Sequence, residues 1–126
     1  KFIYNKNYKS GIASSIKFGI NNISKKTDFF FISLADMPKV KLNIYNKLIK
    51  AKFNNYKKDI IIPIYKEKQG NPILFSKIMK NKIMNIKGDF GAKKIIKLYK
   101  NKTLKVPVFN KGVILDLDTI ENFNSL

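Results

Sequence analysis

The stretch FFFISLADMPKV (residues 29–40) starts as a strand and ends in a loop that carries an acid. Its first six residues are apolar apart from Ser33, which is typical of a strand buried on both faces in a parallel sheet. The small Ala35 leads into Asp36, and Pro38 fixes φ and ends the strand. An aspartate at this point predicts either a ligand-binding role or a cap or turn ahead of the next helix.

The composition narrows the chemistry that the chain can perform. Its 126 residues suffice for one compact domain, and we expect residues 1–126 to form a single, partial domain. Cysteine and histidine are both absent, which excludes disulfides, thiolate nucleophiles and Ser-His-Asp catalysis within this chain. Carboxylates, lysines, hydroxyls, backbone amides and a bound metal ion remain.

The formal net charge of +18 suggests a nucleic-acid-binding surface, because lysines that neutralise phosphates drive non-specific binding. Every basic residue is lysine, however, whereas arginine is the usual bidentate reader of bases and phosphates. The lysines are also spread along the whole chain. A compositional bias toward AT-rich codons explains the charge better, so we do not expect nucleic acid as a partner.

The sequence has no run of about 18 apolar residues, so neither a transmembrane helix nor a membrane partner is expected. No signal peptide is expected either, and we predict a cytoplasmic protein. The chain opens on KFIYN (residues 1–5), which has the pattern of a strand already under way, and not on Met. We therefore expect a fold that is incomplete at its amino terminus.

Apolar periodicity predicts strands that alternate with helices. The predicted strands are 1–5, 29–34, 59–65, 103–109 and 113–118, and the predicted helices are 10–23, 41–53, 76–85, 89–99 and 119–126. A cap is expected near Ser10, and Pro63 predicts a sheet edge or a bulge. The alternation indicates an α/β fold with a mostly parallel sheet flanked by helices.

Acidic residues follow two of the predicted strands. Ligands of open α/β sheets gather beyond the carboxyl ends of the strands, so Asp36 can hold a hard cation such as Mg²⁺. Asp116 and Asp118 lie on one face of the last predicted strand. Asp118, three residues before Glu121, is equally suited to capping a helix. Carboxylates at two strand ends favour a shared metal ion.

The segment IKGDFGAKK (residues 86–94) contains a kinase-like DFG triplet. A kinase is excluded because the chain has no Gly-rich ATP loop, no histidine for an HRD motif and too few residues. Gly88 and Gly91 instead predict turns or close approaches at a helix start, where backbone amides can face an anion. A plain helix start with Asp89 as N-cap is the alternative. The stretch QGNP (69–72) alone indicates a tight turn.

A resemblance to a known family is carried by five segments in order: YNKNYKSGIASSIKFGI, FFFISLADMPKV, IIIPIYKEKQGNPILFS, KGDFGAKKII and VILDLDTIENF. They resemble the nucleotidyltransferase family of molybdenum cofactor biosynthesis, most closely its cytidylyltransferase branch. The resemblance implies a Rossmann-like nucleotidyltransferase fold and the transfer of CMP from CTP to the terminal phosphate of molybdopterin, with release of pyrophosphate. A phosphate monoester is already anionic near neutral pH, so this chemistry needs Mg²⁺ and alignment rather than a histidine base.

The resemblance also assigns roles to residues. Asp36 matches the family's metal-binding aspartate and Asp118 matches the second metal ligand, so both are expected to be catalytic. The nucleotide is expected along a segment that contains Gly11, Ser14 and Ser15, although a polar helix face also explains the two serines. The second substrate is expected beside Gly70, Asn71, Pro72, Gly88, Asp89 and Gly91.

One departure from the family concerns its first strand and Gly-rich loop, which cradles the triphosphate and has no counterpart in this chain. The chain alone is therefore expected to bind triphosphate weakly and to expose a sheet edge. The expected partners are CTP or GTP, the molybdopterin cofactor and molybdoenzyme-maturation proteins. A related enzyme that uses GTP or another phosphate acceptor, and a basic nucleic-acid-binding module, are the alternatives.

Overall fold

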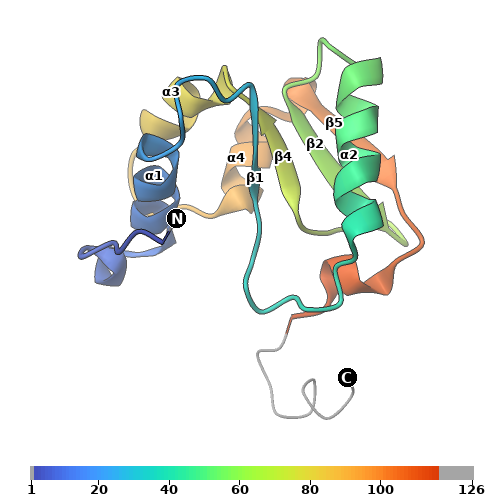
Figure 1. The fold of residues 1–126 in the computed structure, drawn as a ribbon, viewed down its shortest axis with the longest axis horizontal. Coiled ribbons are helices and arrows are strands. Elements are labelled where there is room, and N and C mark those ends of the chain that lie inside the picture. Colours follow the sequence, from blue (N-terminus) through green and yellow to red (C-terminus); the bar gives the residue numbers. More distant parts are fainter. Residues whose placement is uncertain (1, 117–126) are drawn as a thin grey trace.

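The computed structural model describes residues 2–116, which form a five-stranded sheet flanked by helices (Figure 1). This arrangement confirms the α/β fold class. In chain order the main elements are α1 (Ile12–Asn21), β1 (Phe29–Ile32), α2 (Leu42–Asn54), β2 (Ile60–Tyr65), β3 (Lys68–Gln69), β4 (Ile73–Ser76), α3 (Met79–Met84), α4 (Ala92–Leu98) and β5 (Thr103–Pro107). Short 3₁₀ helices are η1 (Tyr8–Ser10), η2 (Lys100–Lys102) and η3 (Lys111–Ile114).

The sheet mixes parallel and antiparallel pairs. Its strands lie in the order β1, β4, β2 and β3, and β5 also pairs with β2. Among the described strands, β2 and β5 pair in parallel, whereas β4 pairs antiparallel with β1 and β2, and β3 with β2. The expected mostly parallel sheet is therefore corrected to a mixed one. The return through residues 66–72 is too short for a parallel crossover, so β4 must run against β2. β1, β2 and β5 still share one direction, and their carboxyl ends share one edge.

β1 lies at the edge of the described sheet, where it pairs with β4 on one side. Phe30 is buried, but the other residues of β1 are only half-buried. The prediction of a strand buried on both faces in a parallel sheet is therefore wrong for β1. The sheet edge predicted at Pro63 is also not found, because Pro63 is buried in the interior strand β2. It lies opposite Val106 of β5 and between the residues that pair with β4 and those that pair with β3, so its missing N–H interrupts neither antiparallel ladder.

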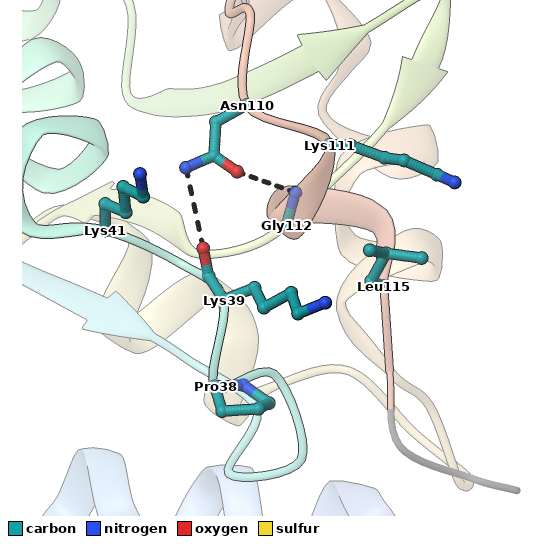
Figure 2. Close-up of a pocket in the computed structure, with 7 residues that line it drawn as sticks. All are labelled: Pro38, Lys39, Lys41, Asn110, Lys111, Gly112 and Leu115. Atoms are coloured by element: carbon teal, nitrogen blue, oxygen red, sulfur yellow. Dashed lines mark hydrogen bonds between the residues drawn. The ribbon is translucent and has the colours of Figure 1, made fainter. Parts of the chain in front are cut away.

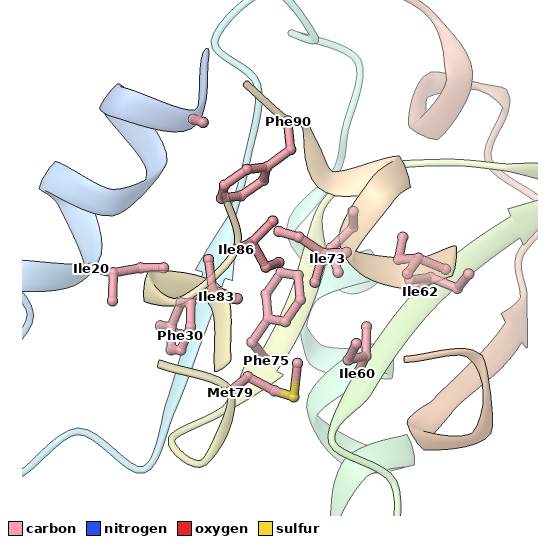
Figure 3. Close-up of a cluster of buried hydrophobic side chains, with 13 residues drawn as sticks. Ile20, Phe30, Ile60, Ile62, Ile73, Phe75, Met79, Ile83, Ile86 and Phe90 are labelled. Carbon is pink, nitrogen blue, oxygen red and sulfur yellow. The ribbon is translucent and has the colours of Figure 1, made fainter. Parts of the chain in front are cut away.

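Alternation along the strands divides the core into two layers, one on each face of the sheet. The first layer packs the sheet against α1, α3 and α4 (Figure 3), and its members include Ile20, Ile60, Ile62, Ile73, Phe75, Met79, Ile83 and Phe90. The second layer packs the sheet against α2 and η3, and its members include Ile44, Leu48, Ile61, Leu74, Val106 and Val113. Both ends of β1, β2 and β5 are thereby fixed relative to the helices.

Two predicted strands are wrong as far as the described residues reach. Residues 2–5 form no strand and are followed by η1. Val113 and Ile114 belong to η3, and residues 115–116 form no strand. The remainder of that prediction and the closing helix 119–126 lie outside the described residues. The helix cap expected near Ser10 falls one residue later, at Gly11, which has no side chain to accept a hydrogen bond. Within residues 2–116, no helix is long and apolar enough to cross a membrane.

Candidate functional site

The shared carboxyl edge of β1, β2 and β5 gathers several of the predicted site residues. Ile32, the last residue of β1, pairs with Ile73, the first residue of β4. Residues that follow β1 therefore lie beside residues that precede β4. This register brings the loop with Asp36 to the same edge as Asn71 and Pro72. In Figure 1 the loop after β1 and η3 lie at this end of the sheet.

Asp36 carries an orphaned polar atom. Its Oδ1 is buried and has no hydrogen-bond partner among the described residues. The helix-cap alternative is wrong, because α2 begins at Leu42 behind an N-cap at Lys41 that makes no side-chain bond. The turn alternative is confirmed, because residues 35–36 form a turn. A buried carboxylate oxygen without a partner is costly unless a cation or a donor reaches it. The donor set therefore fits one oxygen ligand of a hard divalent ion.

No cluster of three or more acidic residues that could enclose a metal occurs within residues 2–116. Asp36 would thus hold a metal with ligands from elsewhere, and the predicted second ligand, Asp118, lies outside the described residues. Asp116 is exposed at the end of the described chain. The expected pairing of Asp36 and Asp118 stays a prediction.

A pocket of about 850 Å³ lies between α1, β1 and α4, and we call it the α1–β1 pocket. It brings together predicted residues from both substrate groups, and its lining includes Ser15, Gly70, Asn71, Asp89 and Gly91. Its walls are mainly apolar, with Ile12, Ile16 and Ile20 of α1 facing β1. The predicted Gly11, Ser14, Pro72 and Gly88 do not line this pocket.

The two serines of α1 hold the segment that precedes the helix. Asn5 Nδ2 donates to Ser14 Oγ at 3.0 Å and to Ser15 Oγ at 3.2 Å. Ser14 Oγ in turn donates to the carbonyl oxygen of Asn7 at 3.0 Å. Ser14 therefore has a structural role here, whereas Ser15 also faces the pocket.

Asp89 connects the GDFG segment to the start of α1. Its Oδ1 accepts from the backbone N–H of Ala13 at 2.9 Å, which satisfies one of the free amides of a helix N-terminus. Asp89 is thus a cap for α1, and the alternative of a cap for α4 is wrong because Gly91 occupies that position. Gly11 has φ +106°, and a Cβ there would collide with the Asp89 carboxylate. These two predicted residues therefore fit each other.

Gly70 and Asn71 pack against η3. The Asn71 N–H donates to the Val113 carbonyl oxygen at 2.7 Å, and a Cβ on Gly70 would meet that oxygen at 2.5 Å. Gly70 is therefore required for the close approach of β3 to η3. Gly88 has φ +76° with open space around it, as expected of a turn glycine.

Comparison with known proteins decides the family. The MobA-like NTP transferase domain family matches residues 1–105. The chain belongs to this family. No curated protein sequence gives a significant match.

Solved structures share the fold of this MobA-like NTP transferase domain. Rv0371c from Mycobacterium tuberculosis H37Rv has a TM-score of 0.74 at 20% identity, over 88% of this chain and 55% of that one. Its complex with manganese has a TM-score of 0.69, at 20% identity over 88% and 57%. A 4-diphosphocytidyl-2C-methyl-D-erythritol synthase from Anaerococcus prevotii has a TM-score of 0.73 at 12% identity, over 99% and 65%. The chain thus spans about 55% of the length of Rv0371c.

A second, basic hollow in this MobA-like domain was not predicted from the sequence. It lies between the loop after Asp36 and η3 (Figure 2), and its lining includes Lys39, Lys41 and Lys111. Lysines so widely spread along the chain gave no sign that these three would meet. The available signal was their position, because each of them follows a predicted strand that ends at the ligand-binding edge.

Proposed function

We propose that this chain is part of a Mg²⁺-dependent nucleotidyltransferase that transfers CMP from CTP to the terminal phosphate of molybdopterin and releases pyrophosphate. Family membership supports nucleotidyl transfer in general. The resemblance of the GIASSI segment to the cytidylyl branch supports CTP as the donor. The observation that carries the proposal is the buried Oδ1 of Asp36, which has no partner within residues 2–116 and lies at the edge where the carboxyl ends of the strands meet.

The negative charge of Asp36 can hold the cation that this reaction needs. Two phosphorylated substrates repel one another, and a bound divalent ion supplies the positive charge that brings their phosphates together. The complex of Rv0371c with manganese supports a divalent ion for this fold. In our proposal Asp36 and Asp118 hold Mg²⁺, and both act as catalytic ligands. An acceptor phosphate is already anionic near neutral pH, so the absence of histidine does not oppose this role.

The α1–β1 pocket and its surroundings divide between the two substrates in this proposal. Gly11, Ser14 and Ser15 lie along the nucleotide, with Asp89 holding the start of α1 in place. Gly70, Asn71, Pro72, Gly88 and Gly91 shape the acceptor side. The domain is a single, partial one that acts in the cytoplasm, and molybdoenzyme-maturation proteins are its further partners.

The test uses the complete polypeptide encoded by the gene, supplied with molybdopterin, Mg²⁺ and one nucleoside triphosphate at a time. Asp36→Asn keeps the shape of the side chain and removes its charge, and we expect pyrophosphate release to fall at least about 100-fold. Asp28→Asn, at the opposite end of β1, is the matched control and should keep the native rate. Native turnover in Asp36→Asn would show that Asp36 is not a metal ligand. Consumption of GTP in place of CTP would assign the guanylyl reaction instead.

A further inference from the structure

The basic hollow continues beyond the residues shown in Figure 2. The hollow of about 760 Å³ adjoins a second one of about 440 Å³, and both share Lys41, Asn110 and Lys111. Lys39 lines the first hollow and Lys47 lines the second. We call the two hollows together the basic trough. Neither Asp nor Glu is among the described residues that line it.

The floor of the basic trough is fixed by contacts between two loops. Asn110 Oδ1 accepts from the Gly112 N–H at 2.7 Å, and Asn110 Nδ2 donates to the Lys39 carbonyl oxygen at 3.5 Å (Figure 2). Gly112 is buried, and a Cβ there would collide with the same carbonyl group. The loop after β1 and the loop after β5 are therefore in direct contact at the Lys39 carbonyl group.

The charge of the basic trough favours a ligand of opposite sign. Lys41 and Lys111 are exposed, and like charges that share one hollow repel one another. Lys47 Nζ donates to the Pro107 carbonyl oxygen at 2.7 Å and lies 5.8 Å from the centre of the Phe109 ring, so it stays at the wall. A phosphate group offers several acceptor oxygens and a charge near −2, which lysine ammonium groups bind as point charges.

The position of the basic trough connects it with Asp36. Ser33 and Leu34 line the α1–β1 pocket, whereas Pro38 and Lys39 line the trough. Asp36 lies on the same loop, between these two pairs. η3, which borders the trough, also receives the contacts of Gly70 and Asn71. A ligand can therefore extend from the acceptor side of the pocket over η3 into the trough.

We propose that the basic trough binds the phosphate group of the acceptor substrate, with Lys41 and Lys111 as its phosphate-binding residues. The assignment to the acceptor rests on the proposed function, whereas phosphate binding itself does not. The nucleotide and the acceptor phosphate then approach Asp36 from opposite sides of its loop.

The test compares two variants of the complete polypeptide that lose the same charge. Lys41→Gln/Lys111→Gln changes the trough, and Lys97→Gln/Lys100→Gln removes two exposed lysines that precede β5, away from its carboxyl end. Inorganic pyrophosphate is titrated without metal while amide NMR shifts are followed. In the native protein we expect shifts at Lys41, Lys111 and Gly112. The Kd should rise at least about tenfold in the trough variant, because each charge-assisted bond contributes a factor of that order, and by less than about twofold in the control.

The outcomes separate the two proposals. Equal weakening in both variants, or shifts confined to Ser15 and Gly91, would overturn the phosphate site in the trough. In turnover assays, the trough variant should raise the KM for the acceptor and leave the KM for the triphosphate unchanged. Turnover with an unchanged acceptor KM would overturn the acceptor assignment and leave the proposed function standing. Pyrophosphate binding at Gly112 without turnover of any triphosphate would support the site while refuting the proposed function.

Discussion

The α1–β1 pocket and the basic trough lie on either side of the Asp36 loop and are built in opposite ways. The pocket has apolar walls, and its outer wall, α1, is held at its start by the bond from the Ala13 N–H to Asp89. The trough has mixed polar and apolar walls that carry lysines, and its two loops meet where Asn110 and Gly112 contact the Lys39 carbonyl group. One hollow is bounded by a helix beside an open sheet edge, and the other by two loops in direct contact.

This difference indicates how each hollow meets a ligand. No strand within residues 2–116 pairs with the outer side of β1, so the backbone groups of that edge can accept a further strand or a ligand. α1 covers the pocket on one side and buries Ala13 and Ile20 in the core. The trough is bounded by two loops in contact, and in our proposal it selects its ligand by charge. The pocket thus has an open sheet edge on one side, whereas the trough is enclosed by two contacting loops. The Asp36 loop separates the two hollows.

The largest expected effect is a difference in amide hydrogen exchange at the open edge of β1. The Asp28 carbonyl oxygen accepts from the Lys77 N–H beside β4, so alternation points the amides of Phe30 and Ile32 toward β4 and those of Phe29 and Phe31 outward. In residues 1–126 we expect the two outward amides to exchange at least about 100-fold faster than the other two. Deuterium exchange followed by NMR measures all four rates. Equal protection would show that the outer edge of β1 is covered.

One glycine in each hollow allows a matched substitution. Gly112→Ala forces a methyl group against the Lys39 carbonyl, and we expect the free energy of unfolding to fall by about 1–3 kcal/mol. Gly19 lies in α1 beside the pocket, with no atom within 4 Å of its missing Cβ. Gly19→Ala should raise the free energy of unfolding by about 0.5–1 kcal/mol, since alanine favours helix. Urea denaturation measures the free energy of unfolding of both variants. A change in the same direction for both would contradict the contrast between the two hollows.

The sequence predicted the elements of this fold better than their directions. The helices α2 and α4 fall within the predicted ranges 41–53 and 89–99 to within a few residues, because apolar residues recur at helical spacing. A period of two marks a strand but carries no direction. The direction of β4 follows from the short return through residues 66–72, but only once Ile73–Ser76 is identified as a strand of its own. The alternation in 113–116 also suggested a strand. Val113 and Ile114 instead belong to η3, where the Asn110 side chain accepts from the Gly112 N–H.

The candidate site was predictable only where chain order determines it. Asp36 directly follows a strand, so its place at the sheet edge followed from the order of elements. Asp89 instead caps a helix 76 residues away, a contact that depends on how α1 packs. The basic trough likewise joins Lys41 to Lys111 through two loops that are far apart in the sequence. Contacts of this kind need the folded chain.

Substitution of Asp89 is expected to have the smallest effect on stability. It also tests most directly whether the two hollows act independently. Asp89→Ala removes the acceptor for the Ala13 N–H and should lower the free energy of unfolding by about 1 kcal/mol. Asp89→Asn keeps an accepting oxygen and loses only the interaction of the charge with the helix dipole, about 0.3–1 kcal/mol. Urea denaturation ranks the two. Pyrophosphate binding at Gly112 should not change in either variant, because Asp89 lines only the α1–β1 pocket. A weakened trough in Asp89→Ala would instead show that the two hollows are coupled, through the Asp36 loop or through the contacts of Gly70 and Asn71 with η3.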